Sequence, residues 1–210
     1  MEFIQAKHYR KGRKSKVDTL VLHYFSVVSI DKNNPFNLPV IKDWLANGVP
    51  DNGTVVKVST HYLIGRDGDV IQFVDEKDTA WHAGVSNLNG RAINGSCNDF
   101  SIGIELVGGQ WVAFTDKQYE SLIGLTKGII KRNPEITKET IVGHEEIAVG
   151  RKIDPGKMFD WVKYFNGVFE ESQPLTATPI PLFPKVSNIT SGQDSTIIEK
   201  LKNLLKRMLK

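Results

Sequence analysis

The stretch FSIGIELVG, residues 100–108, carries the most information about how this chain folds. It is apolar or glycine except at Ser101 and Glu105, and such a run is typical of a strand at the centre of a sheet, buried on both faces. Glu105 interrupts this pattern, and a carboxylate is costly to bury unless it is paired or has a function. The stretch predicts a central strand that carries a chemically active side chain. A structural ion pair is the alternative for Glu105.

Two further segments predict strands that end at histidines. Residues 17–25 (VDTLVLHYF) are β-branched and apolar up to His23, which is the pattern of a buried strand. Residues 139–144 (ETIVGH) form a shorter apolar segment that delivers His144. Both imidazoles are therefore expected where a strand gives way to the next element.

A hairpin and a short helix are predicted between these strands. In residues 54–74, two apolar runs flank Asp67-Gly68, a dipeptide that suits a type I′ turn with both residues at positive φ. Residues 38–47 (LPVIKDWLAN) predict a helix closed by Gly48.

Two more helices are predicted towards the C-terminus. The first begins with a capping box at Thr115 and Gln118, and residues 133–134 (Asn-Pro) end it. The second follows residues 155–156. Its candidate core residues are Phe159, Trp161, Val162 and Phe165. Strands and helices interleave, so the chain predicts a mixed α/β domain over residues 17–170.

The basic residues are concentrated at the two ends. The net charge is only +3, but residues 7–16 hold six Lys or Arg and no acidic residue, and residues 199–210 hold five with one. Residues 17–198 carry 16 Lys or Arg and 22 Asp or Glu. Basic ends favour an anionic partner such as a membrane, a cell-wall polymer or nucleic acid. For the basic N-terminal arm, residues 1–16, the simpler expectation is a solvated, mobile segment in which His8 is exposed.

The composition changes after residue 170. Prolines among Ser, Thr and Asn predict a linker over residues 171–195. Residues 196–210 predict a cationic amphipathic helix, which opens with Thr196 and Glu199 in a capping-box relation. Such a helix can lie on an anionic membrane or on lipopolysaccharide. Alternatively, its apolar stripe packs on the domain or on a second chain.

Several classes of protein are disfavoured. No apolar run reaches the roughly 20 residues of a membrane span. The N-terminus lacks the apolar region of a secretory signal peptide, so we expect a chain made for the cytoplasm, or one that leaves it by another route. Cys97 is the single cysteine, which excludes an intramolecular disulfide, and its surroundings carry no activating signature. Nucleic-acid binding is not expected, because no aromatic-interleaved surface or known motif supports it.

Residues 144–156 (HEEIAVGRKIDPG) place His144, Lys152 and Asp154 on one short segment. A continuous helix does not explain this spacing, because a glycine and a proline interrupt it. A loop that wraps around a single point would bring the side chains together. Alternation in an extended loop would also put Lys152 and Asp154 on the same side.

The residue types indicate what that point is. Two imidazoles, His23 and His144, with the carboxylate of Asp154 match a catalytic zinc site, which uses three protein ligands and leaves one position for water. A structural zinc site would use more cysteine. Glu105 could then take the proton of the attacking water. Lys152 could stabilise the oxyanion of a tetrahedral intermediate.

Five blocks of the sequence resemble the zinc-dependent N-acetylmuramoyl-L-alanine amidases of the amidase_2 family. They follow one another in the family's order and approximate spacing over residues 15–167: VDTLVLHY, STHYLIGRDGDVIQFV, AWHAGVS, CNDFSIGIELVGG and VGHEEIAVGRKIDPG. This family includes AmpD-like and AmiD-like enzymes and T7-lysozyme-like phage amidases. The animal peptidoglycan recognition proteins share its fold.

The resemblance implies a central mixed β-sheet flanked by helices, with zinc in a surface groove. It implies that His23, His144 and Asp154 bind the zinc ion. It also implies that Glu105 is the catalytic carboxylate and that Lys152 stabilises the transition state.

Further residues are implied to contact the substrate. These are His82, in the AWHAG block, and Tyr24, whereas His61 is expected to be structural. Asp154 and Glu105 favour the AmpD/AmiD branch, because T7-lysozyme-like members usually have cysteine as the third ligand and lack this glutamate. Tyr24 resembles AmiD and the CNDFSIGIEL block resembles AmpD, so the subfamily stays open.

The implied reaction is zinc-dependent hydrolysis of the amide bond between the lactyl group of N-acetylmuramic acid and L-alanine. We expect a cell-wall lytic enzyme that reaches peptidoglycan through a holin or a secretion system, because the basic tail favours this role. The alternative is a cytoplasmic amidase that recycles 1,6-anhydro-muropeptides. A third possibility is a non-catalytic peptidoglycan-binding module, but such modules commonly lack a metal ligand.

Overall fold

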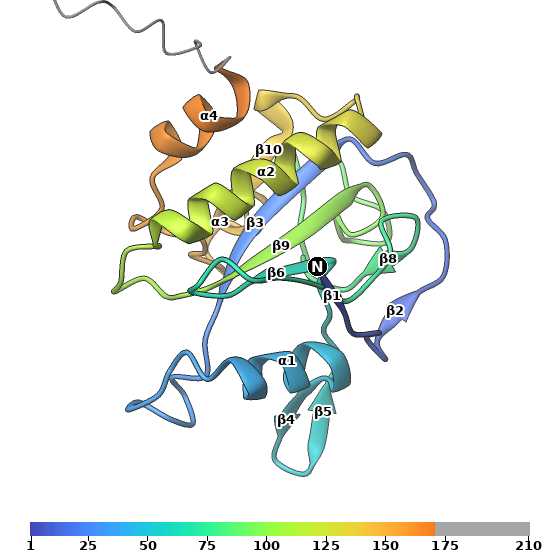
Figure 1. The fold of residues 1–210 in the computed structure, drawn as a ribbon. Helices are drawn as coiled ribbons and strands as arrows, with labels where there is room; N and C mark the ends of the chain where they lie inside the picture. Colours follow the sequence, from blue (N-terminus) through green and yellow to red (C-terminus); the bar gives the residue numbers. More distant parts are fainter. Residues whose placement is uncertain (171–210) are drawn as a thin grey trace, which may run out of the picture. The chain divides into compact units, whose positions relative to one another are not determined.

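A six-stranded mixed sheet forms the centre of the protein in a computed structural model that describes residues 1–170 (Figure 1). The strands, in spatial order, are β1 (Glu2–Phe3), β7 (Val70–Gln72), β6 (Tyr62–Ile64), β9 (Ser101–Val107), β3 (Thr19–Phe25) and β10 (Ile141–Gly143). Strand β9 pairs in parallel with β6 and β3, and all of its residues are buried. The central strand predicted over residues 100–108 is therefore confirmed. Only β6 and β7 pair antiparallel, which makes the sheet mixed, as expected.

The register of the two central strands decides which side chains share a face. His23 on β3 lies opposite Glu105 on β9. The neighbouring residues Leu22 and Ile104 point to the other face, where they join a core cluster with residues of α2 and α4. Because side chains alternate along a strand, His23 and Glu105 lie on the face away from these two helices.

Helices cover both faces of the sheet (Figure 1). Helices α2 (Asp116–Arg132) and α4 (Trp161–Phe169) pack on one face, and α1 (Leu38–Asn47) packs on the other. Helix α1 ends at Gly48, as predicted, and a φ of 94° there favours glycine. The capping box predicted at Thr115 and Gln118 is present at the start of α2.

The hairpin predicted over residues 54–74 is shorter than expected. Its first part, β5 (Thr54–Val56), pairs instead with β4 (Val49–Asp51) in a separate two-stranded sheet. The prediction of a type I′ turn is wrong, because only the glycine of the Asp67-Gly68 pair has a positive φ. The N–H of Gly68 donates to the Gly65 carbonyl, as in a type I turn followed by a glycine bulge.

Two expectations for the segment after β10 need correction. His144 follows directly on β10, as expected, but the segment predicted as a loop begins there with the four-residue helix α3 (His144–Ile147); β10 itself follows the 3-10 turn η1 (Lys138–Thr140). In α4, Val162 was expected in the core but is 70% exposed. The fully buried residue is Tyr164, whose hydroxyl bonds Thr126 of α2. Packing against α2 therefore selects a face of α4 that apolar spacing alone did not identify.

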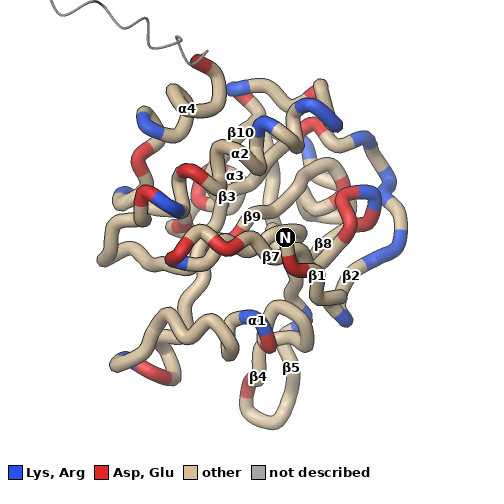
Figure 2. Tube along the Cα trace, in the orientation of Figure 1, with Lys and Arg blue, Asp and Glu red and all other residues tan. Residues whose placement is uncertain are grey.

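The N-terminal arm packs on the domain, so the expectation of a solvated segment is wrong. Strand β1 pairs with β7, and β2 (Tyr9–Arg10) pairs with β8 (Thr79–Ala80). Figure 2 shows the Lys and Arg residues of the arm along the edge of the domain near β8. Arg13 donates to the backbone carbonyls of Glu76, Asn98, Asp99 and Ser101. His8, expected to be exposed, is partly buried and stacks on Trp81.

The linker predicted over residues 171–195 and the amphipathic helix predicted over residues 196–210 lie outside the described residues. Their boundaries therefore stay predictions from the sequence. Within residues 1–170, no helix combines the length and apolar character needed to cross a membrane.

Replacing Arg13 with leucine should lower the free energy of unfolding by about 1–3 kcal/mol, because buried carbonyls at Asp99 and Ser101 lose their donor. Urea denaturation of both proteins measures the difference. Lys11→Leu is the matched control, since Lys11 is an exposed cation of the same arm and its loss should change stability by less than about 0.5 kcal/mol. Equal midpoints for wild type and Arg13→Leu would show that the arm does not stabilise the domain.

Candidate metal centre and active site

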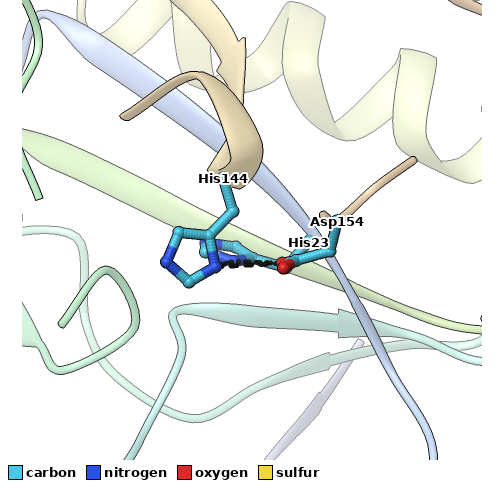
Figure 3. A group of neighbouring side chains, drawn as sticks. All are labelled: His23, His144 and Asp154. Carbon is cyan, nitrogen blue, oxygen red and sulfur yellow. Dashed lines mark hydrogen bonds and ion pairs between the residues drawn. The ribbon is translucent and has the colours of Figure 1, made fainter. Parts of the chain in front are cut away.

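Three side chains from separate elements converge on one point (Figure 3). His23 comes from β3, His144 from the start of α3, and Asp154 from the loop between α3 and α4. The Nδ1 atoms of His23 and His144 are 2.9 Å apart, and Asp154 Oδ2 lies 3.1 Å and 3.0 Å from them. The loop folds back because the N–H of Glu145 donates to the carbonyl of Asp154, at 2.9 Å. This turn accounts for the sequence spacing of His144 and Asp154.

The triangle of ligand atoms fits a metal ion. Zinc–nitrogen bonds of about 2.0–2.1 Å in a tetrahedral site separate ligand atoms by roughly 3.3 Å, close to the distances found here. The Nε2 atom of His144 lies 3.0 Å from the Ala83 carbonyl oxygen, which can only accept. The ring proton is therefore on Nε2, and Nδ1 presents a lone pair. A lone pair and carboxylate oxygen this close repel each other unless a cation or a shared proton lies between them.

Burial and hydrogen bonding set the charge state of these ligands. Burial lowers the pKa of His23 to about 4, although the adjacent carboxylate of Asp154 opposes this shift. Burial alone would raise the pKa of Asp154, but the adjacent rings of His144 and His23 hold it well below its usual range. At neutral pH His23 is neutral and Asp154 is ionised, which are the states that metal binding requires.

Glu105 stands beside the three ligands on the neighbouring strand. It is 7% exposed, and its Oε2 atom has no hydrogen-bond partner among the described residues. Burial raises the pKa of Glu105 well above its ordinary value, the charge of Asp154 raises it further, and the charge of Lys152 lowers it. The structural ion pair considered for Glu105 is therefore absent among the described residues, and a buried carboxyl group of this kind is typical of functional sites.

A pocket of about 350 Å³ opens over this cluster. It is lined by all seven residues that the sequence analysis assigned to the site: His23, Tyr24, His82, Glu105, His144, Lys152 and Asp154. Tyr24 is partly buried in the wall and Lys152 is exposed. The structure thus brings together in one cavity side chains that come from four separate parts of the sequence.

The two other buried histidines, His82 and His61, have hydrogen-bond partners within the protein. His82 Nδ1 lies 2.9 Å from His23 Nε2, and His82 Nε2 lies 3.2 Å from the Ser101 hydroxyl. Both ring nitrogens are therefore engaged within the protein, which does not support His82 as a polar contact for substrate. His61, expected to be structural, is fully buried and accepts the N–H of Gly103 at 3.0 Å.

Sequence reasoning missed Arg151 and the backbone that it holds. Arg151 lines the pocket and donates to the carbonyls of Ala83 and Val85, at 2.8 Å and 2.7 Å. These bonds tie the segment after β8 to the loop that carries Asp154. The position of Arg151 beside Lys152 could have indicated that it belongs to the site. Its partners, however, are backbone carbonyls, which every residue has, so residue types do not predict this contact.

The fold and this site agree with the family that the chain matches. Residues 13–157 match the family described as N-acetylmuramoyl-L-alanine amidase (Amidase_2), which is well over half of the chain. The chain belongs to this family of amidases.

Comparison with individual relatives shows which members of the family the chain resembles most extensively. The chain is 42% identical over 173 residues to the 1,6-anhydro-N-acetylmuramyl-L-alanine amidase AmpD of Haemophilus influenzae, covering 79% of this chain and 90% of that protein. A crystal structure of a selenomethionine derivative of AmpD has a TM-score of 0.70 and 38% identity, over 80% of this chain and 93% of that one. Escherichia coli AmiD, solved with anhydro-N-acetylmuramic acid-L-Ala-D-γ-Glu-L-Lys as substrate, has a TM-score of 0.55 and 30% identity, over 75% of this chain and 60% of that one. The likeness to AmpD is therefore more extensive than the likeness to AmiD.

Glu105→Gln should raise the free energy of unfolding of the metal-free protein at pH 8 by about 1–3 kcal/mol, because it removes an unpartnered buried carboxylate. The pKa of Glu105 is raised in the folded state, so the folded protein binds more protons than the unfolded chain above about pH 4.5. The wild type therefore loses stability from this group as the pH rises, and the advantage of the variant should shrink towards pH 5.

Urea denaturation in the presence of a chelator, at pH 5 and pH 8, measures this difference. Glu120→Gln, at an exposed position on α2, is the control and should show no such pH dependence. A variant less stable than wild type at pH 8 would mean that Glu105 takes part in a stabilising ion pair.

Proposed function

We propose that this protein hydrolyses the amide bond between the lactyl group of N-acetylmuramic acid and L-alanine, and that His23, His144 and Asp154 hold a zinc ion for this reaction. The observation that carries the proposal is the convergence of three candidate ligand atoms within 3.1 Å of one another, beside a carboxyl group that has no partner within residues 1–170. Membership of the amidase family supports the same reaction. A zinc ion would supply Lewis acidity towards the amide carbonyl and would activate water at neutral pH.

Glu105 is the residue that moves the proton. Its carboxylate accepts the proton of the attacking water and delivers it to the nitrogen of the departing L-alanine, so the amine leaves in neutral form. A general acid–base group works best when its pKa is near the operating pH, and burial shifts Glu105 in that direction. Its position opposite His23 keeps this carboxyl group at the metal site.

Lys152 and Tyr24 face the substrate. The charge of Lys152 lowers the pKa values of both His23 and Glu105, so its field reaches the centre of the site. The ammonium group stabilises the negative charge that develops on the amide oxygen. Tyr24 forms part of the pocket wall, where it can contact a muropeptide.

The substrate that we infer is a soluble 1,6-anhydro-muropeptide, and the role is recycling in the cytoplasm. The similarity to AmpD over 90% of its length supports this choice, and the AmiD structure was also solved with an anhydro-muropeptide. These relatives support the recycling alternative over the lytic role that the sequence analysis put first. The lytic role rested on the basic tail, which lies outside the described residues.

Chelation should abolish hydrolysis of an anhydro-muropeptide, and added zinc should restore it. Glu105→Ala should keep zinc but lose about 10²–10⁴-fold in kcat, the usual contribution of a positioned acid–base group. Lys152→Ala should lower kcat more than it raises KM, because its partner oxyanion exists only in the transition state. Lys157→Ala, an exposed cation in the same loop that does not line the pocket, is the matched control.

Mass spectrometry of the released peptides measures these rates, and metal analysis of each purified protein accompanies it. Full activity in chelator, with no zinc in the protein, would refute the metal assignment. Near-normal kcat in either alanine variant would refute the role given to that residue.

Intact sacculi and soluble anhydro-muropeptides, digested side by side, should distinguish recycling from lysis. We expect the soluble substrate to be cleaved much faster. Faster release from sacculi would support the lytic role instead.

The contact of residues 196–210 with an anionic membrane or lipopolysaccharide remains a proposal from the sequence pattern. Removing residues 190–210 should leave hydrolysis of soluble muropeptides unchanged and should reduce co-sedimentation with vesicles that contain phosphatidylglycerol. Equal sedimentation of both proteins would contradict the membrane contact.

A further inference from the structure

Two consecutive residues at the pocket, His82 and Ala83, contact the outward-facing nitrogens of both histidine ligands. His82 Nδ1 lies 2.9 Å from His23 Nε2. The carbonyl oxygen of Ala83 lies 3.0 Å from His144 Nε2. The ring nitrogens that point away from Asp154 are thus both engaged by one short segment, which is separated from each ligand by about 60 residues of sequence.

The direction of the hydrogen bonds follows from the far end of this chain of contacts. The carbonyl of Cys97 can only accept, so the Ser101 hydroxyl donates to it, at 2.8 Å. The Ser101 oxygen then accepts from His82 Nε2, at 3.2 Å. A neutral His82 with its proton on Nε2 has a lone pair on Nδ1, so it accepts the Nε2 proton of His23. The Nδ1 atom of His23 is left with a lone pair directed at the metal site.

The surroundings hold His82 in this position. The side-chain oxygen of Asn98 accepts the backbone N–H groups of both His82 and Ala83, at 3.2 Å and 2.8 Å. Gly103 of β9 leaves the space that the His82 ring occupies, because a Cβ atom there would lie 2.4 Å from the ring carbon Cγ. One amide side chain and one glycine therefore fix the segment that contacts both ligands.

We propose that His82 is a positioning residue that holds His23 in the tautomer whose Nδ1 binds the metal. The hydrogen bonds continue from His82 to Ser101 and end at the Cys97 carbonyl. This inference rests on the proposed function, because it takes His23 as a metal ligand. Metal-binding histidines generally donate their second ring proton to an outer acceptor, and loss of that acceptor costs about 10–100-fold in metal affinity. Here the acceptor is itself a histidine, and Ser101 determines which of its nitrogens can accept.

Three substitutions separate the two contacts of His82. In His82→Asn the amide oxygen stands close to the position of Nδ1 and keeps an acceptor for His23. In His82→Gln the longer side chain reaches towards Ser101 and loses the contact with His23, and His82→Leu loses both. Zinc affinity, measured by competition with a chromophoric chelator, should be close to wild type for asparagine. It should be about 10–100-fold weaker for glutamine and leucine.

The cobalt-substituted protein provides a readout that is independent of activity. Cobalt d–d absorption reports ligand geometry, so the spectra of the glutamine and leucine variants should differ from that of wild type. His61→Asn is the matched control. His61 is also fully buried, with its ring centroid 5.7 Å from that of His82, but it has no hydrogen bond to a metal ligand. Its loss should change stability while zinc affinity and the cobalt spectrum stay unchanged.

The outcomes distinguish this inference from the proposed function. If the wild type binds neither zinc nor cobalt, the proposed function is wrong. If the wild type binds metal and the glutamine and leucine variants bind it equally tightly, with unchanged cobalt spectra, the positioning role is wrong. If those variants do not fold, Ser101→Ala provides the test, because it removes the acceptor that fixes the His82 tautomer. Weaker zinc binding by Ser101→Ala would support the positioning role of His82. Unchanged zinc binding would overturn it.

Discussion

The parallel pairing of β3 with β9 is the constraint on which the rest of the site depends. In this register His23 and Glu105 are direct neighbours on one face, while Leu22 and Ile104 pack under the helices on the other. A slip of one residue would carry one of these two polar side chains into the apolar core. The helices α2 and α4 therefore support the site indirectly, because burying one face of the strands determines which face carries the chemistry.

Around this pair of strands, loops that are distant in the sequence complete the site. Asp154 reaches it because its loop folds back on α3, and Arg151 connects the same loop to the segment after β8. The cost of the arrangement is concentrated at Glu105, whose buried carboxyl group has no partner among the described residues. Such local instability is common at catalytic sites, where the group that must change its charge cannot be fully neutralised by its surroundings.

Where a pattern had a local physical cause, the structure agreed with it. Helix α1 ends at Gly48 and α2 begins at Thr115, because caps depend on a few adjacent residues. The turn at Gly68 and the exposed Val162 were predicted wrongly. Hairpin loop length depends on where both strands end, and the buried face of α4 depends on what lies beneath it. Neither can be read from one segment alone.

The sequence by itself determined the central strand and the alternation of strand and helix, because periodicity records burial directly. Residue type and the resemblance to the amidase family identified seven of the residues that line the pocket. Only the tertiary structure decided where the N-terminal arm packs and which contacts the pocket residues make. It placed the N-terminal arm on the domain through Arg13, and it placed His82, which was expected to contact the substrate, within hydrogen-bond distance of His23. These roles depend on hydrogen bonds to backbone carbonyls and to side chains far away in the chain. Such bonds form only when folding has brought their donors and acceptors together, so no local sequence pattern predicts them.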